Sequence, residues 1–336
     1  MNPERFDRIT EAYAGLRIAV VGDYCLDRYL EIDPARPETS IETGLAVHNV
    51  VNVRAQPGAA GTVLNNLVAL GVGTIFAVGF CGEDGEGFEL RRALGSLAGV
   101  NLDHFLTTPL RRTFTYCKPL VLEHGAPPRE LNRLDSKNWT PTPRAVAQRI
   151  VESLVALRSQ VDAVIVMDQV DAAGTGVITP EVLPVLGAFP RVIADSRRGL
   201  RDYPPVIFKM NAAELRALTG READESGAAR ELAGRNGRPV FVTMAERGIV
   251  GAEPGGTVEH VPALPLRGPI DVVGAGDSVT ANLAAALAAG ATTREAIEMA
   301  ITASSLVIHQ LGTTGTASVE LLRALAVGNA AALSAR

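Results

Sequence analysis

Short apolar segments that each end in a polar residue recur along the whole chain, with helix-like segments between them. They occupy residues 17–23, 74–80, 161–168, 191–195, 206–211 and 238–245. A strand that is apolar on both faces must be covered on both faces. Such strands alternating with helices are typical of a mostly parallel sheet with helices on each side. The sequence therefore predicts an α/β protein with a doubly wound sheet.

The bulk composition limits the classes of partner. The chain has 336 residues, 47% of them apolar, a net charge of −5 and a pI near 5.7. An acidic balance argues against nucleic acid or an anionic membrane as a partner. The 3 cysteines form no C-x-x-C pair, which suits a reducing compartment. With no signal-like apolar segment and no apolar run long enough to span a bilayer, we expect a soluble cytoplasmic protein.

Two segments interrupt the alternation of strands and helices. Residues 39–58 and 112–135 are rich in Val, Thr, Leu and aromatic residues and have no helical period. We interpret them as strands of a small second sheet inserted into the main domain. Such a sheet serves either as a lid over a site or as a dimerisation flap.

The segment "PIDVVGAGDSVTANLAAALAAG" places an acid on the first turn of a predicted helix. Gly274, Ala275 and Gly276 are small enough for an anion to approach the free N–H groups at the helix start. A carboxylate beside an anion site needs a chemical reason, and a general base that takes a proton from an attacking hydroxyl supplies one. In isolation, however, Asp277 is equally well explained as a helix cap.

"DVVGAGD" resembles the D-[TV]-x-G-A-G-D signature of the PfkB, or ribokinase-like, family of sugar and nucleoside kinases. Four further motifs follow the family's order: "VVGDYCLDRYL", "PGAAGTVLNNLVALG", "NAAE" and "VTMAERG", with "SSLVIHQLGTTG" where the family closes around adenine. The resemblance implies a ribokinase-like fold, with residues 1–336 as one kinase domain and lid segments at about 28–57 and 110–135. It also implies ATP and Mg²⁺ as cofactors.

The resemblance also assigns site residues. Asp277 becomes the base, and the backbone of Gly274, Ala275 and Gly276 becomes the anion hole. The implied acceptor-binding residues are Asp27, Asp23, Gly58, Ala59 and Thr62, although Asp23 equally fits a turn at the strand end. The implied nucleotide-binding residues are Asn211, Glu214, Thr243, Glu246, Gly248 and Gly312.

The sequence allows two explanations for the Asn211–Glu214 motif and two for Asp271. Asn211 and Glu214 are expected to hold Mg²⁺ through water, but N-x-x-E also fits a capping box. Asp271 is expected to fix its loop or to frame a monovalent-cation site.

Within the family, "VVGDxxLDRY", "RLD" at 133–135 and "LGTxG" are similar to the heptose-phosphate kinases. The acceptor side departs from the pattern: Ala59 replaces a glycine, Thr62 replaces an asparagine, and "DSRRG" at 195–199, which includes Arg197 and Arg198, stands where Asp-Pro-Lys-Gly is expected. The predicted activity is phosphorylation of a hydroxyl on a sugar or sugar phosphate, and the resemblance implies an acceptor like heptose 7-phosphate. A nucleoside kinase and a catalytically silent sugar- or nucleotide-binding regulator are the alternatives. The apolar lid strands further predict a homodimer.

Overall fold

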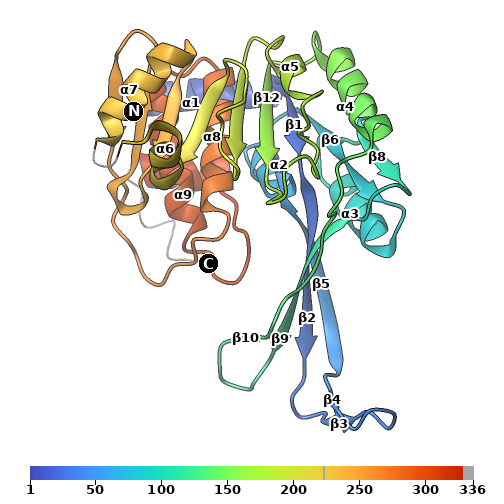
Figure 1. Cartoon of the computed structure of the whole chain (residues 1–336). Coiled ribbons are helices and arrows are strands. Elements are labelled where there is room, and N and C mark those ends of the chain that lie inside the picture. Colours follow the sequence, from blue (N-terminus) through green and yellow to red (C-terminus); the bar gives the residue numbers. More distant parts are fainter. Residues whose placement is uncertain (222–223, 328–336) are drawn as a thin grey trace.

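The large sheet of the computed structural model, which describes residues 1–221 and 224–327, forms the centre of the molecule (Figure 1). Its strands run in the order β17-β16-β15-β14-β13-β12-β1-β6-β7, with β8 paired to β6. Every pair from β15 to β7 is parallel, whereas β16 and β17 are antiparallel. The bounds are β1 Arg17–Gly22, β6 Thr74–Gly82, β7 Val100–Asn101, β8 Phe105–Thr108, β12 Ala163–Asp168, β13 Val192–Ser196, β14 Ile207–Asn211, β15 Val240–Thr243, β16 Ile249–Ala252 and β17 Val258–Val261.

Helices cover both faces of this sheet because its central strands are apolar on both sides. In β1, Ile18 and Val20 face one core, whereas Ala19 and Val21 face the other. The first core contains residues of α1 Pro3–Glu11, α2 Ala60–Ala69, α3 Gly85–Gly95, α8 Ala275–Ala288, α9 Thr293–Val307 and α10 Val319–Ala326. The second contains residues of α4 Arg144–Leu157, α5 Leu183–Leu186, α6 Ala212–Thr219 and α7 Glu225–Asn236. Two 3₁₀ turns, Ala12–Gly15 and Ala245–Arg247, complete the described helices.

A second, smaller sheet projects from the main body as a long blade (Figure 1). It consists of β2 Tyr24–Ile32, β5 Val50–Ala59, β9 Phe114–Val121, β10 Arg129–Glu130 and β11 Leu134–Ser136, and the hairpin of β3 Glu38–Thr39 and β4 Ala46–Val47 lies at its tip. β2 follows β1 after a single residue, so this sheet begins at Tyr24. The predicted lid segment, which started at about residue 28, began a few residues too late. The predicted fold class, a doubly wound sheet with a small β lid, is confirmed.

No helix within the described residues is long and apolar enough to cross a membrane.

Candidate active site

The start of α8 is built to leave backbone donors uncovered. Gly274 is the N-cap residue and has φ 81°, a left-handed conformation that disfavours any residue with a Cβ. No side chain caps this helix, so the N–H groups of Gly276 and Asp277 have no intrahelical partner. These donors and the helix dipole together favour an anion at this point.

Asp277 lies on the first turn of α8 in a half-buried position. Burial raises the pKa of its carboxyl to about 7, and the charge of Asp195 contributes in the same direction. Lys209 and Arg197 oppose this shift. A carboxylate whose pKa is near neutral is well suited to accept a proton from a hydroxyl at physiological pH.

A buried ion pair lies directly beneath the anion site. Lys209 on β14 donates to Asp195 on β13 at 2.6 Å, and the hydroxyl of Thr280 on α8 donates to the same carboxylate oxygen at 3.2 Å. A Cβ built on Gly276 would come within 3.3 Å of the Lys209 amine. The pair therefore joins two strands to α8 and places a positive charge beside its first turn.

A cavity of about 490 Å³ faces Asp277 from the lid side. Asp27 on β2 contributes a 7% exposed carboxylate, which accepts from Lys118 of β9 at 3.1 Å. Lys118 also lies 4.8 Å from the centre of the Tyr29 ring. Asp27 on β2 and Asp277 on α8 therefore line the same cavity from two different parts of the fold.

Charged side chains of both signs surround this cavity. Its cations are Lys118, Arg133, Lys137 and Arg197, and its carboxylates are Asp27, Asp135, Asp171 and Asp277. Besides Lys118 with Asp27, three further pairings are direct: Arg133 with Asp135 at 2.8 Å, Lys137 with Asp171 at 3.1 Å and Arg197 with Asp171 at 3.4 Å. Carboxylates can accept hydrogen bonds from sugar hydroxyls, and lysine and arginine side chains can bind a phosphate ester.

The predicted acceptor residues at the start of α2 have distinct positions. Ala59 and Thr62 line the cavity. Gly58 is not among the lining residues, and a side chain at that position would collide with the Asp27 carboxylate. Ala59 has φ 53° and ψ −116°, a combination that glycine tolerates and alanine does not favour. The departure from Gly-Gly therefore strains the backbone beside the acceptor.

Asp23 is placed outside the cavity, in agreement with the strand-end alternative. Its 2% exposed carboxylate accepts from the backbone N–H groups of Gln169, Val170 and Val177 at 2.7–3.1 Å. Burial raises its pKa to about 6, with the charge of Asp168 adding to the effect. Asp23 thus holds the 169–177 loop, which carries Gln169 and Asp171 to the cavity.

The two arginines of the "DSRRG" segment have different surroundings. Arg198 turns inward and donates at 2.8 Å to both carboxylate oxygens of Asp168. The same buried carboxylate also accepts from Ser196 and Tyr203. Arg197 instead lines the acceptor cavity. Only Arg197 is therefore positioned to meet a ligand.

A second cavity, of about 540 Å³, lies on the other side of the 270–274 loop. Thr243, Glu246 and Gly248 line it, together with apolar residues Ile249, Leu264, Leu266, Ile270, Val272, Ile301 and Ile308. Gly248 has φ 89°, and a Cβ there would collide with the Val261 carbonyl. An apolar slot with a few polar groups at one end is suited to a planar base joined to a polar chain.

Gly312 and Asp271 close the loop between the two cavities. Asp271 accepts from Val273 N at 3.0 Å and from Gly312 N at 3.4 Å, and its own N–H donates to Ile308 at 2.7 Å. Gly312 is absent from the lining of the apolar cavity. Both Asp271 oxygens are engaged by backbone donors, which corresponds to the loop-fixing alternative.

Asn211 and Glu214 form a capping box at the start of α6. The Asn211 side chain accepts from Glu214 N at 2.9 Å, and Glu214 Oε2 accepts from Asn211 N at 2.7 Å. Burial raises the pKa of Glu214. The box uses one carboxylate oxygen of Glu214, so the other stays compatible with a water-mediated Mg²⁺ contact.

Several site residues carry no motif that marked them in advance. Tyr116 and Lys118 alternate on β9 and pair with Asp27 and Tyr29 of β2. Their period of two was a usable signal for one shared face. The pairing of Lys209 with Asp195 had no such signal, because it depends on the adjacency of β13 and β14.

Residues 17–320 match the model of the pfkB family of carbohydrate kinases. The chain belongs to this family. Its predicted fold, family and enzyme class are confirmed, because a pfkB-family carbohydrate kinase is a phosphotransferase that acts on a sugar hydroxyl.

Curated relatives agree with this membership. The chain is 30% identical over 333 residues to the bifunctional protein HldE of Bradyrhizobium sp., covering 95% of this chain and 65% of that protein. It is 32% identical over 334 residues to HldE of Nitrobacter winogradskyi, with the same coverages. The chain thus spans just under two thirds of the length of these relatives. The predicted likeness to the heptose-phosphate kinase branch is consistent with them.

Solved structures share the fold. Arabidopsis thaliana ribokinase complexed with ribose and ATP matches with a TM-score of 0.65 at 19% identity, covering 93% of this chain and 98% of that one. Escherichia coli phosphofructokinase-2 in complex with substrates and products matches with a TM-score of 0.70 at 18% identity and the same coverages.

Proposed function

We propose that this pfkB-family kinase transfers the γ-phosphoryl group of ATP to a hydroxyl of a sugar phosphate. One observation carries the proposal: Asp277, the uncovered N–H groups of α8 and the Asp27–Lys118 pair all border one cavity. Asp277 takes the proton of the acceptor hydroxyl, and Asp27 orients the sugar. The free N–H groups of Gly276 and Asp277 stabilise the charge that develops on the transferred group, whereas the Ala275 N–H, also expected there, donates to the Val272 carbonyl.

Two of the four cations of the cavity, whose lining also holds four carboxylates, support a phosphorylated acceptor over a neutral one. Arg197 and Lys137 share a single carboxylate, Asp171, so this part of the lining carries excess positive charge. A phosphate ester supplies the missing negative charge and can accept bidentate hydrogen bonds from an arginine. The resemblance to heptose-phosphate kinases makes a heptose phosphate the first acceptor to test.

The apolar cavity is proposed as the adenine site, with Thr243, Glu246 and Gly248 toward the ribose and phosphates. Asn211 and Glu214 would hold Mg²⁺ through water, since the box leaves one Glu214 oxygen free. Bound there, the ion would neutralise charge on the nucleotide phosphates. Asp271 is proposed to close the loop between nucleotide and acceptor.

A homodimer through the blade is also proposed. Its tip exposes apolar side chains: Ile41 is 100% exposed and Leu45 is 69% exposed. Val50, Val51 and Val53 continue this surface along β5. An apolar patch on an uncovered sheet is typical of a surface that pairs with a second copy. We also place the enzyme in the cytoplasm, where ATP is available and its three free thiols stay reduced.

The decisive experiment measures ADP release against heptose, pentose and hexose phosphates, the corresponding free sugars, and nucleosides. Stimulation by a sugar phosphate, lost in Asp277→Asn and kept in the exposed-loop control Asp103→Asn, supports the proposal. Stimulation by a nucleoside alone replaces it with the nucleoside-kinase alternative. If no acceptor stimulates turnover while ATP still binds, the chain is the silent regulator. Omitting Mg²⁺ in the same assay tests the metal.

A further inference from the structure

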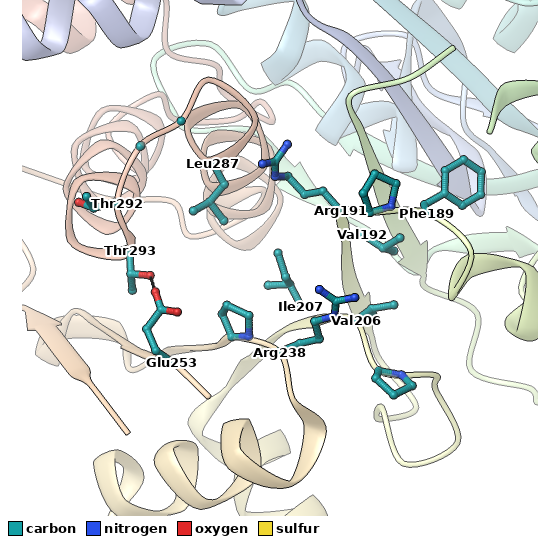
Figure 2. A pocket seen from close by; sticks show the side chains of 15 residues that line it. Phe189, Arg191, Val192, Val206, Ile207, Arg238, Glu253, Leu287, Thr292 and Thr293 are labelled. Atoms are coloured by element: carbon teal, nitrogen blue, oxygen red, sulfur yellow. Dashed lines mark hydrogen bonds between the residues drawn. The ribbon is translucent and has the colours of Figure 1, made fainter. Parts of the chain in front are cut away.

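A third cavity lies at the amino-terminal ends of strands of the large sheet, whereas the kinase site lies at their carboxyl ends. It has a volume of about 350 Å³ and lies where β13, β14 and β15 begin, between the end of α8 and the start of α9 (Figure 2). Pro190, Pro205 and Pro239 line it, one beside the start of each strand. Proline has little backbone freedom, so these walls are rigid. The volume is within the range of small-ligand sites.

Two arginines enter this cavity from different strands. Arg191 precedes β13 and extends toward Leu287, whereas Arg238 precedes β15 and lies beside Val206 (Figure 2). Within residues 1–221 and 224–327, neither guanidinium has a carboxylate partner; Arg191 makes one 3.3 Å bond to the carbonyl of Asp162. Two unneutralised guanidinium groups provide paired donors for a carboxylate or a phosphate.

The other residues that line the cavity further limit the kinds of ligand that it could bind. Glu253 is the acid of this cavity, and its carboxylate accepts from the hydroxyl of Thr293 (Figure 2). The start of α9 is already closed by the Thr292–Glu295 capping box. Val192, Val206, Ile207 and Leu287 provide apolar walls. A ligand that matches this lining has an anionic group at the arginines and a small apolar body against the walls.

We propose that this cavity is an effector site for a small organic anion, a phosphate monoester or carboxylate with an apolar body. The elements that begin at the cavity end at the kinase site. β13 leads to Asp195 and β14 leads to Lys209, which form the ion pair under Gly276. A strand of five residues spans only about 15 Å. A ligand that shifts the first residues of β13 and β14 therefore acts on the Asp195–Lys209 pair at the other end of these strands.

The test uses phenyl phosphate as the probe and isothermal titration calorimetry on the full chain. We expect the double variant Arg191→Gln/Arg238→Gln to bind it at least tenfold more weakly. The matched control, Arg235→Gln on the outside of α7, should bind it like the unmodified protein. Equal unfolding midpoints without probe show that all variants are folded. Unchanged affinity in the double variant overturns the proposal, as does binding that Lys118→Met abolishes, because Lys118 lines the acceptor cavity.

The effector role is tested by reciprocity. A ligand that is coupled to the kinase site changes the dissociation constant of ATP, and ATP changes that of the ligand by the same factor. We expect saturating phenyl phosphate to change the ATP dissociation constant at least twofold in the Arg235→Gln control and not in the double variant. Equal ATP affinity with and without probe in both proteins would refute the coupling. Neither binding measurement requires turnover, so this test is separable from the proposed kinase reaction.

Discussion

Replacing Ala59 by glycine is expected to stabilise this protein, although most alanine-to-glycine changes destabilise. Ala59 has φ 53° and ψ −116° at the N-cap of α2. A residue with a Cβ held in such a conformation costs on the order of 1–3 kcal/mol. Glycine removes this strain but gains about 0.4–1 kcal/mol of unfolded-state entropy. It also loses a partly buried methyl, which contributes less than about 0.8 kcal/mol. The balance is about 1 kcal/mol in favour of Ala59→Gly.

The assay is urea denaturation followed by circular dichroism, with the free energy of unfolding compared at equal m-values. An effect of about 1 kcal/mol raises the thermal midpoint of a chain of this size by roughly 2 °C. The control is Ala156→Gly, an exposed position within α4 with ordinary helical geometry. The same chemical change should there cost about 0.5–1 kcal/mol. The two variants are therefore expected to shift stability in opposite directions.

The reasoning would be refuted if Ala59→Gly lost stability to the same extent as Ala156→Gly. That outcome would mean that the positive φ at Ala59 is not strained in the folded protein. A stabilised variant with an unchanged KM for the acceptor would show that the missing glycine changes the backbone energy and not the acceptor contacts.

Three further predictions concern the kinase site and the blade. Asp277→Asn should lower turnover by about 10²–10⁴-fold, and the fall in rate of the unmodified enzyme below about pH 7 should disappear. The raised pKa means that ionised Asp277 destabilises the folded state. The same variant should therefore be more stable than the unmodified protein at pH 8, by about 1–2 kcal/mol, and this gain should vanish near pH 4. Urea titrations at both pH values measure the two free energies of unfolding. Lys118→Met removes the ion-pair partner of Asp27, which is proposed to bind the acceptor. In steady-state kinetics it should raise the KM of the acceptor at least tenfold and leave the KM of ATP unchanged. Ile41→Glu combined with Leu45→Glu should convert a dimer into a monomer in light scattering, whereas a dimer of unchanged mass would place the interface elsewhere.

The architecture was predictable from the sequence because its signals are local. Residues 17–22 and 163–168 are apolar on both faces, and only a parallel sheet covered by helices satisfies such strands. The start of α8 was predictable for a similar reason: small residues followed by an acid define a helix terminus within one short segment. The second sheet was recognised as strands, but β2 begins at Tyr24, since nothing in the sequence marks a change of sheet after a single residue.

The chemistry of individual side chains was less predictable because it depends on which strands become neighbours. Asp23 and Asp27 occur in the same "GDYCLD" segment, yet one is enclosed by backbone donors and the other faces the cavity. Their difference arises from the 169–177 loop, which is distant in sequence. Likewise, N-x-x-E describes a capping box and a metal site equally well, and the structure shows the box in place.

The pair of Asp195 and Lys209 connects these observations. Asp195 raises the pKa of Asp277 and Lys209 lowers it. Neutralising either partner alone therefore moves the pKa of Asp277 away from about 7. A neutral residue at 195 would leave a buried lysine without a partner, which costs several kcal/mol. The two partners thus adjust, in opposite directions, the pKa of Asp277, which burial raises most, and they join β13 to β14 beside α8. Because β13 and β14 hold the two partners, a change that separates these strands is expected to shift the pKa of Asp277 as well.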